Sequence, residues 1–350
     1  MNADKKRFRR NRPLPLGGRE AKRGGSSPAR RLRREQGAAL LTAMIIVALV
    51  ATLASSMLWQ QWRAIQVEAA ERARTQSAWV LSGALDWARL ILREDAKTGG
   101  TDHLGEPWAV PLAEARLSTF LAADKENTED APDAFLSGSI TDANARYNLF
   151  SVASSGTIDP IELAALQSLC GTIGISADVA NRVAAGLRDA APPAQGASGA
   201  ASAPPPPANP PLMPRSAVQL TWFGIDAETA RLLEPYVVLL PERTLVNVNT
   251  ASREVLVAAL PGLDLATAER IVQSRQRAPI KSKGDLLAIA PSLPPASYDH
   301  VATRSDYFEV RGRLRLGDVV LEQRSLVHRV GVNVEVLQRE RVSARDGLGS

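Results

Sequence analysis

The hydrophobic pattern opens with an uninterrupted apolar run at residues 38–58, AALLTAMIIVALVATLASSML, which holds 21 residues and no charge. As an α-helix the run would be about 31 Å long, which matches the hydrocarbon core of a bilayer. A secretory signal peptide would have a shorter apolar region followed by a small-x-small cleavage site. The pattern therefore predicts a membrane-spanning helix over residues 38–58.

Beyond this run, apolar residues recur at steps of three and four as far as Ile91, which is the period of an amphipathic helix. No proline lies between Ala38 and Arg93, so both segments are expected to form one helix of roughly 80 Å. We expect its apolar stripe to be buried within the chain, with a partner protein as the alternative. The candidates for packing against a partner are Leu58, Trp62, Ile65, Ala69 and Val80.

Alternating residues typical of strands occupy 307–316 and 319–330, and Val332, Val334 and Val336 suggest the start of another. Residues 138–150 also alternate around a turn signal at Asp142, which predicts a hairpin. An antiparallel sheet built from both ends of the chain implies that the segment between them is inserted.

That middle segment, residues 151–300, has a weak repeat. Gly174, Gly224 and Gly262 are each followed by Ile or Leu, and each has an Ala six residues later. Glycine suits a tight turn, and alanine permits close helix packing, so the repeat predicts three helix-turn-helix hairpins. Residues 190–214, rich in Pro, Ala, Gly and Ser, are expected to be a disordered loop.

The net charge of +5 resides in the N-terminal tail. Residues 1–37 hold 13 Lys or Arg and three acids, a balance of +10, which leaves −5 for the rest of the chain. A body of that sign does not attract a phosphate backbone over its whole surface. The basic flank places the N-terminus in the cytoplasm and the residues after the apolar run outside it. The single cysteine, Cys170, excludes an intrachain disulfide and is expected to be a buried thiol.

The junction Arg33-Arg34-Glu35-Gln36-Gly37 with Ala38 resembles a type IV pilin-like signal. This resemblance implies cleavage after Gly37 by prepilin peptidase and methylation of Ala38. The leader is longer than is common in that family, which leaves the true start codon open.

The fifth residue from Ala38 is Thr42, where most pilin-like proteins carry a Glu. A carboxylate there is costly in the membrane unless a neighbouring subunit neutralises it. The K-type minor pseudopilin of type II secretion systems resembles the present case, and its tip position is attributed to the missing carboxylate. A tolerated substitution is the alternative reading of Thr42.

The resemblance to the K-type family extends from Gly37 to about Val342. It includes a D-x-x-x-R-x-N-L segment, here Asp142, Arg146, Asn148 and Leu149. The family implies an α+β fold, with a pilin-like long N-terminal helix packed on an antiparallel sheet and a large inserted all-α domain of helix-hairpin-helix-like repeats. The expected domains are a leader at 1–37, a transmembrane part at 38–58, a pilin-like part at 59–150, the helical insertion at 151–300, C-terminal strands at 301–342 and a tail at 343–350.

Residues 246–287 also resemble the helix-hairpin-helix of DNA-binding competence proteins, in which a Gly-apolar-Gly turn approaches a phosphate. Here Asp264 replaces the second glycine, and Ser176 and Asp226 occupy that place in the other two turns. The hairpin fold is therefore expected without its phosphate contact. Thr250 is expected to cap the first helix of this hairpin. A membrane-anchored DNA receptor is the alternative function.

No Walker loop, G-x-S-x-G elbow or metal-binding Cys/His set occurs, so we predict that the chain is not an enzyme. No cofactor is assigned. Calcium is implied for several pseudopilins by the family resemblance, but a solvated loop is the alternative for the one acidic cluster, which comprises Asp124, Glu126, Glu129, Asp130 and Asp133.

The resemblance implies a subunit at the tip of the type II secretion pseudopilus, which initiates pseudopilus assembly for protein export across the outer membrane. It implies as partners the I- and J-type minor pseudopilins, prepilin peptidase and the inner-membrane secretion platform, and no nucleic acid. The expected location is the inner membrane, single-pass, with the C-terminal domain in the periplasm.

Overall fold

A computed structural model describes residues 29–117, 134–191, 209–317 and 319–342. Contacts divide the chain into two units, residues 1–70 and 71–350. In the first unit, helix α1, which spans Ala29–Thr98, exposes every side chain from Ala38 to Ala70. Among the described helices, only α1 is long and apolar enough to cross a membrane: its most apolar window has a mean hydropathy of 2.4 and is not buried at all. The predicted apolar helix is therefore present.

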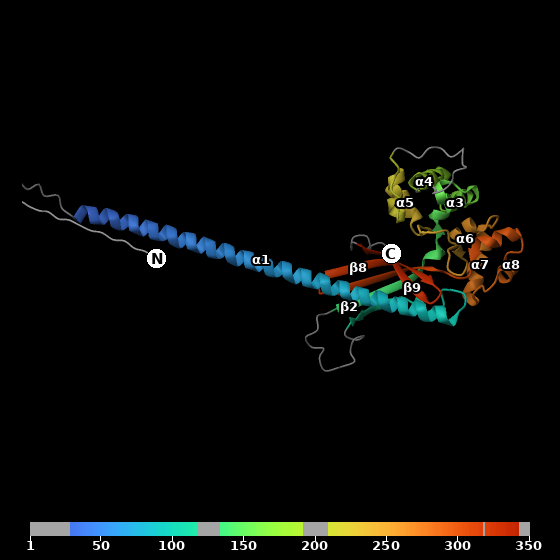
Figure 1. Ribbon diagram of the computed structural model, residues 1–350, viewed down its shortest axis with the longest axis horizontal. Coiled ribbons are helices and arrows are strands. Elements are labelled where there is room, and N and C mark those ends of the chain that lie inside the picture. The colour runs from blue at the N-terminus through green and yellow to red at the C-terminus, as the bar shows by residue number, and fades with distance from the viewer. Residues whose placement is uncertain (1–28, 118–133, 192–208, 318, 343–350) are drawn as a thin grey trace, which may run out of the picture. The chain divides into compact units, whose positions relative to one another are not determined.

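The second unit contains a five-stranded antiparallel sheet in the order β1-β2-β7-β8-β9, with the last part of α1 lying along it (Figure 1). Its strands are β1 (Leu112–Arg116), β2 (Ala134–Asp142), β7 (Tyr307–Leu316), β8 (Val319–Val330) and β9 (Asn333–Val342). Strand β2 pairs with β7 along its full length, from Ala134↔Leu316 to Asp142↔Phe308. This pairing confirms a sheet built from both ends of the chain.

The predicted stripe in this part of α1 runs through Val80, Ala84, Trp87 and Ile91, and the face that is buried on the sheet is displaced from it by one residue. Ser77, Leu81, Leu85, Ala88 and Leu92 are buried, whereas Trp87 is 50% exposed. The predicted row and the row next to it on the helix both contain apolar residues. The period of the pattern therefore predicted the helix correctly but could not show which of the two rows is buried. Leu81 sits over Gly312, where an added Cβ would come within 3.1 Å of its Cδ2 atom.

The hairpin predicted at residues 138–150 is wrong. Asp142 accepts a hydrogen bond from the Asn144 amide and caps a 3₁₀ turn, Ala143–Ala145, that directs the chain away from the sheet. The next strand, β3 (Tyr147–Asn148), pairs in parallel with β4 (Val237–Val238). The turn signal was correct, but the turn leads into the inserted segment.

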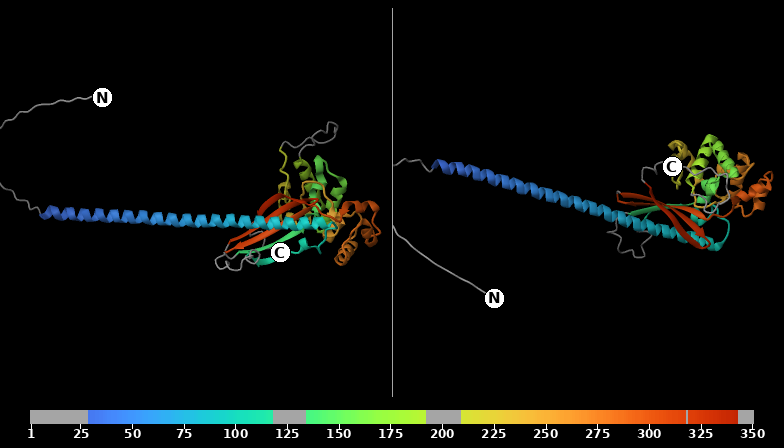
Figure 2. Two further views of the ribbon diagram at one scale, coloured as in Figure 1. Left: turned by 60° about the horizontal axis from the view of Figure 1, so that its bottom comes forward. Right: turned by 45° about the horizontal axis from the view of Figure 1, so that its top comes forward.

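The helices gather near the end of the sheet where β2 ends and β7 begins (Figures 1 and 2). They surround one large apolar core that includes the buried Cys170, as expected for this thiol. The α-helices are α3 (Pro160–Thr172), α4 (Ala177–Ala190), α5 (Ala227–Leu233), α6 (Arg253–Ala259), α7 (Leu265–Arg277) and α8 (Lys283–Ile289). The 3₁₀ helices that contribute to this core are η3 (Leu149–Gly156), η4 (Ala217–Phe223) and η5 (Pro295–His300), whereas η1 (Pro107–Ala109) contacts β2 and η2 (Ala143–Ala145) contacts β7. Two further short strands, β5 (Val246–Asn247) and β6 (Val301–Ala302), pair in parallel.

The three predicted hairpins are present as α3–α4, η4–α5 and α6–α7. Their turn glycines, Gly174, Gly224 and Gly262, have φ values of +78°, +75° and +89°, which favour glycine. The repeated alanines, Ala180, Ala230 and Ala268, are fully buried. The first arm of the middle hairpin is a 3₁₀ rather than an α-helix. Most of the predicted 190–214 loop lies outside the described residues.

Candidate functional site

The predicted processing residues, Gly37 and Ala38, lie within α1. The Thr42 hydroxyl donates to the carbonyl oxygens of Ala38 and Ala39, at 2.6 and 3.2 Å. The hydroxyl proton of Thr42 is thus donated within its own helix, and the side chain carries no charge. Nothing at Thr42 requires a partner to neutralise it.

One face of α1 in the second unit is apolar and solvent-exposed. Trp79 is 75% exposed, Trp87 50% and Leu90 48%, and between them an added Cβ at Gly83 would meet no atom within 4 Å. Spacings of four, four and three residues place these side chains on one side of the helix. We call Trp79, Gly83, Trp87 and Leu90 the tryptophan face. Large apolar side chains exposed on one side of a helix make this face a candidate site of protein contact.

A cavity of about 270 Å³ lies between α1 and the sheet beside this face. Trp87 and Val110, which is 69% exposed, border it, and Leu85, Trp108 and Ile140 line its interior. An apolar side chain from a partner could therefore enter beside Trp87. Of the predicted partner-packing residues, Leu58, Trp62, Ile65 and Ala69 are exposed and Val80 is half-buried, and their contact with a partner stays a prediction.

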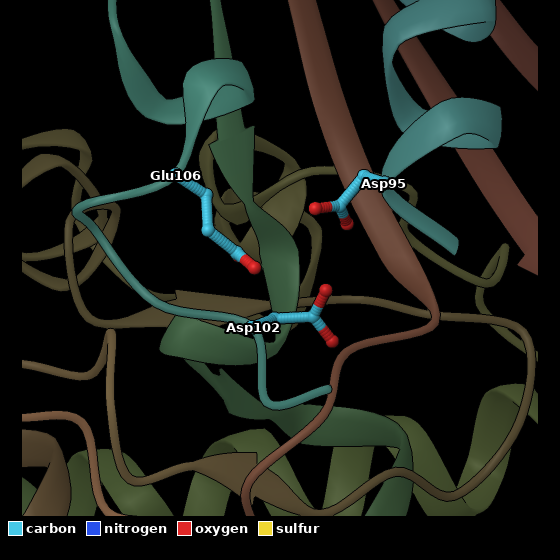
Figure 3. A group of neighbouring side chains, drawn as sticks. All are labelled: Asp95, Asp102 and Glu106. Carbon is cyan, nitrogen blue, oxygen red and sulfur yellow. The ribbon is translucent and has the colours of Figure 1, made fainter. Parts of the chain in front are cut away.

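Three carboxylates, Asp95 in the last turn of α1 with Asp102 and Glu106 from the loop after it, converge with oxygen atoms within 4.8 Å of one another (Figure 3). Their convergence was not anticipated from the sequence. The Arg329 guanidinium bridges two of them, with Nη1 2.7 Å from Asp95 Oδ2 and Nη2 2.5 Å from Asp102 Oδ1.

Glu106 Oε2 accepts hydrogen bonds from Trp108 Nε1 at 2.7 Å and from the His103 amide at 2.9 Å. Arg329 thus supplies a positive charge between Asp95 and Asp102, and the three carboxylates with Arg329 form an ion-pair cluster. Burial, followed by the charge of Glu106, raises the pKa of Asp95 to about 6, against the opposing effect of Arg329. The acidic cluster at residues 124–133, for which calcium binding and a solvated loop were the two interpretations, lies outside the described residues.

A buried polar cluster joins the helices to the sheet. We call Asp102, Asp142, Asn247, Thr250 and Ser305 the polar joint. Asp142 Oδ2 accepts from Asn247 Nδ2 at 3.0 Å, from Thr250 Oγ1 at 2.5 Å and from Ser305 Oγ at 2.6 Å. Asp102 Oδ2 accepts from the Ser305 amide at 2.7 Å. Burial raises the pKa of Asp142 despite these donors.

The sequence predicted Thr250 to be a helix cap, and this prediction is wrong because Thr250 belongs to the polar joint. Thr250 is buried and donates to Asp142, whereas Ser252 caps α6 by accepting from the Val255 amide at 3.3 Å. The two hydroxyl residues lie close together in sequence, so the helix start alone could not distinguish them.

The D-x-x-x-R-x-N-L segment also serves this junction. Arg146 pairs with Glu309 on β7 at 2.9 Å, and Asn148 Oδ1 accepts from the Leu240 amide at 3.1 Å. Glu309 is surrounded by Arg146, Arg311 and Arg324, and their charges outweigh its burial and lower its pKa to about 2. Glu309 and Arg329 were not singled out from the sequence, because alternating charged residues on a strand carry no mark of burial.

The hairpin turns are occupied by their own caps. Asp264 Oδ1 accepts from the Thr267 amide at 2.9 Å, and its Oδ2 accepts from Thr267 Oγ1 at 2.7 Å. Ser176 and Asp226 cap α4 and α5 in the same manner. The residue that replaces the second glycine of the turn is therefore a helix cap in all three hairpins.

Comparison with known proteins agrees with this architecture. Family models described as "Type II secretion system (T2SS), protein K" match residues 145–242 and 246–303. Type II secretion system protein K of Pseudomonas aeruginosa is 32% identical over 339 residues, covering 90% of this chain and 93% of that protein. The Pectobacterium carotovorum protein of the same name is 28% identical, covering 88% of this chain and 96% of its own length.

Among solved structures, a chain of the GspK–GspI–GspJ complex from enterotoxigenic Escherichia coli aligns with a TM-score of 0.60 at 21% identity. The alignment covers 79% of this chain and 99% of that chain, which confirms the α+β fold with its long helix, sheet and helical region. Taken with the extent of the identity to the Pseudomonas aeruginosa protein, these similarities show that the chain belongs to the type II secretion system protein K family.

Proposed function

We propose that this chain is a minor pseudopilin at the tip of the type II secretion pseudopilus, where it initiates pseudopilus assembly for protein export. It is anchored in the inner membrane by residues 38–58, with a cytoplasmic N-terminus and a periplasmic sheet and helical region. Prepilin peptidase cleaves after Gly37, and the inner-membrane secretion platform receives the mature subunit. The chain catalyses no reaction in this role.

The observation that carries the tip assignment is the state of Thr42. Its hydroxyl is bonded to Ala38 and Ala39 within its own helix, so the apolar segment holds no charge that a preceding subunit must neutralise. A subunit of this kind has no electrostatic need for a neighbour above it. It is therefore suited to be the first member of a filament.

The tryptophan face supports partnership with the I- and J-type minor pseudopilins. Trp79, Trp87 and Leu90 form an apolar surface on α1 that nothing in the described chain covers. The solved relative is named as a complex of K-, I- and J-type proteins, which supplies the identity of the proposed partners.

The test of partnership is co-expression of the full chain with the I- and J-type proteins of the same cell, followed by detergent extraction and size-exclusion chromatography with light scattering. We expect one stable complex containing a copy of each protein. Failure to form it, together with salt-sensitive retention of the chain on duplex DNA, would overturn the proposal in favour of a DNA receptor.

The test of the tip assignment is Thr42→Glu. A carboxylate within the membrane-spanning part of a helix is costly unless it is neutralised, by up to about 2.5–3.5 kcal/mol at the helix centre and less towards its ends, where residue 42 lies. We expect Thr42→Glu to reduce exoprotein secretion, measured in culture supernatant, while the matched Thr42→Val remains near wild type. Equal secretion by the two variants would remove the proposed reason for the tip position.

A further inference from the structure

A groove between α8 and β6 is separate from every surface discussed above. It has a volume of about 410 Å³, and we call it the α8–β6 groove. Buried apolar side chains form its floor, among them Ile280, Leu286 and Val301. Lys281, Lys283 and Arg304 also line it, all three exposed, and its lining includes no acidic residue.

The surroundings of the groove retain positive charge after their ion pairs are counted. Lys283 pairs with Asp299, and Asp285 lies near Lys281. Arg304 forms no ion pair with any residue in the described part of the chain. The groove is thus lined by three cationic side chains, one of them without an ion-pair partner in the described residues, in a chain whose residues 38–350 carry −5 overall.

The N-terminus of α8 is partly occupied by its own cap. Ser282 Oγ accepts a hydrogen bond from the Asp285 amide, and Asp285 Oδ2 accepts one from the Ser282 amide. What remains available to a ligand is an apolar floor with cationic side chains around it.

This combination favours a peptide over a nucleic acid. Single-stranded nucleic acid is usually held by aromatic side chains that stack on bases, and no aromatic residue lines this groove. A peptide that alternates carboxylates with aliphatic side chains matches both parts, since the aliphatic groups cover the floor and the carboxylates reach the cations.

We propose that the α8–β6 groove binds an acidic, aliphatic segment of a protein partner, with Lys281, Lys283 and Arg304 contacting its carboxylates. The inference is independent of the assembly role, because the groove lies on the helical region and shares no lining residue with the tryptophan face.

The test uses the full chain in detergent and a short fluorescein-labelled peptide in which Glu and Leu alternate, with binding followed by fluorescence anisotropy. We expect Lys281→Glu with Arg304→Glu to weaken binding by about tenfold, because two attractive contacts become repulsive. The matched control is Arg231→Glu, an exposed cation on α5 outside the groove, which should change affinity less than about twofold. If the double charge-reversal variant, Lys281→Glu with Arg304→Glu, does not fold, the neutral variant Lys281→Gln with Arg304→Gln is used in its place.

Peptide variants and a competitor separate the possible causes. A peptide with Gln in place of Glu, and another with Ser in place of Leu, should each bind more weakly than the parent, and duplex DNA should not displace the parent. Absence of binding by the wild-type chain, equal binding of the Gln peptide, an equal effect of Arg231→Glu, or displacement by duplex DNA would each overturn the proposal.

Discussion

At the scale of single residues, the largest surprises are charged groups inside the sheet region. Arg329 is 5% exposed and holds Asp95 and Asp102 together, although its position in an alternating strand gave no sign of this. The sequence shows which residues can ionise. Their burial depends on loops such as residues 99–106, which come from elsewhere in the chain. Such contacts are beyond what periodicity predicts.

The raised pKa of Asp95 makes the stability of the fold depend on pH. Because its folded pKa of about 6 exceeds the ordinary value of 3.8, the folded chain binds the proton more tightly than the unfolded chain does. The contribution of Asp95 to stability is therefore greatest below about pH 4 and is lost as the pH rises towards 6. Asp95→Asn should flatten this part of the profile, measured by urea unfolding of the full chain across that range.

The control for Asp95 is Asp86→Asn, on an exposed carboxylate of the same helix that pairs with Arg89. This variant should leave the slope between pH 4 and pH 6 unchanged. If Asp95→Asn retains the wild-type slope, the ion-pair cluster is not the group that titrates.

A second residue-scale prediction concerns Gly262, whose φ of +89° is unfavourable for any side chain. Gly262→Ala should lower the free energy of unfolding by about 1–2 kcal/mol because of backbone strain. Gly171→Ala is the matched control, since Gly171 lies in α3 with open space around it and should be neutral or stabilising by up to about 1 kcal/mol. Urea unfolding with tryptophan fluorescence measures both, and equal effects would contradict the role of the turn.

At the scale of elements, the hydrophobic pattern predicted correctly those helices, strands and hairpins whose signature lies within one short stretch of sequence. It identified α1, the strands β7 and β8 and the three hairpins, because each has a local signature in the sequence. It missed the exact face of α1, where Leu81 rather than Val80 is buried, because both rows are apolar. It also misread Asp142 as a hairpin turn, since the partner of β2 lies far along the chain.

The tryptophan face gives an element-scale prediction. Trp79→Ser with Trp87→Ser should weaken association with the I- and J-type proteins by about tenfold or more, because exposed tryptophans at an interface often dominate its binding energy. Trp222→Ser is the matched control, because Trp222 is 48% exposed on the helical region. Co-purification of the three proteins from detergent extracts measures the effect. An equal loss with Trp222→Ser would show that exposed tryptophans act through solubility rather than through this face.

At the scale of the whole second unit, the polar joint connects sheet and helices through one carboxylate. Asp142 lies at the end of β2, while Asn247 and Thr250 follow the middle hairpin and Ser305 precedes β7. Asp142→Ala would remove the acceptor that Asn247, Thr250 and Ser305 share, and should lower the free energy of unfolding by about 3 kcal/mol. Urea unfolding tests this value.

The comparison for Asp142 is Asp178→Ala, which removes an exposed carboxylate paired with Arg182 and should cost less than about 1 kcal/mol. Thr250→Val removes a single donor to Asp142 and should fall between the two. A cost for Asp142→Ala as small as that for Asp178→Ala would mean that the polar joint does not stabilise the attachment of the helices to the sheet.

The antiparallel pairing of β2 with β7 has a consequence for how such a chain could diversify. Because Asp142 and Phe308 are direct cross-strand partners, the exit and return of the inserted segment are one strand spacing apart, about 5 Å. A tight turn could close that gap and leave every strand pairing of the sheet intact. The helical region could thus be replaced by that of a relative without changing the sheet. Residue 142 would have to be replaced together with it, because Asp142 accepts hydrogen bonds from the inserted segment.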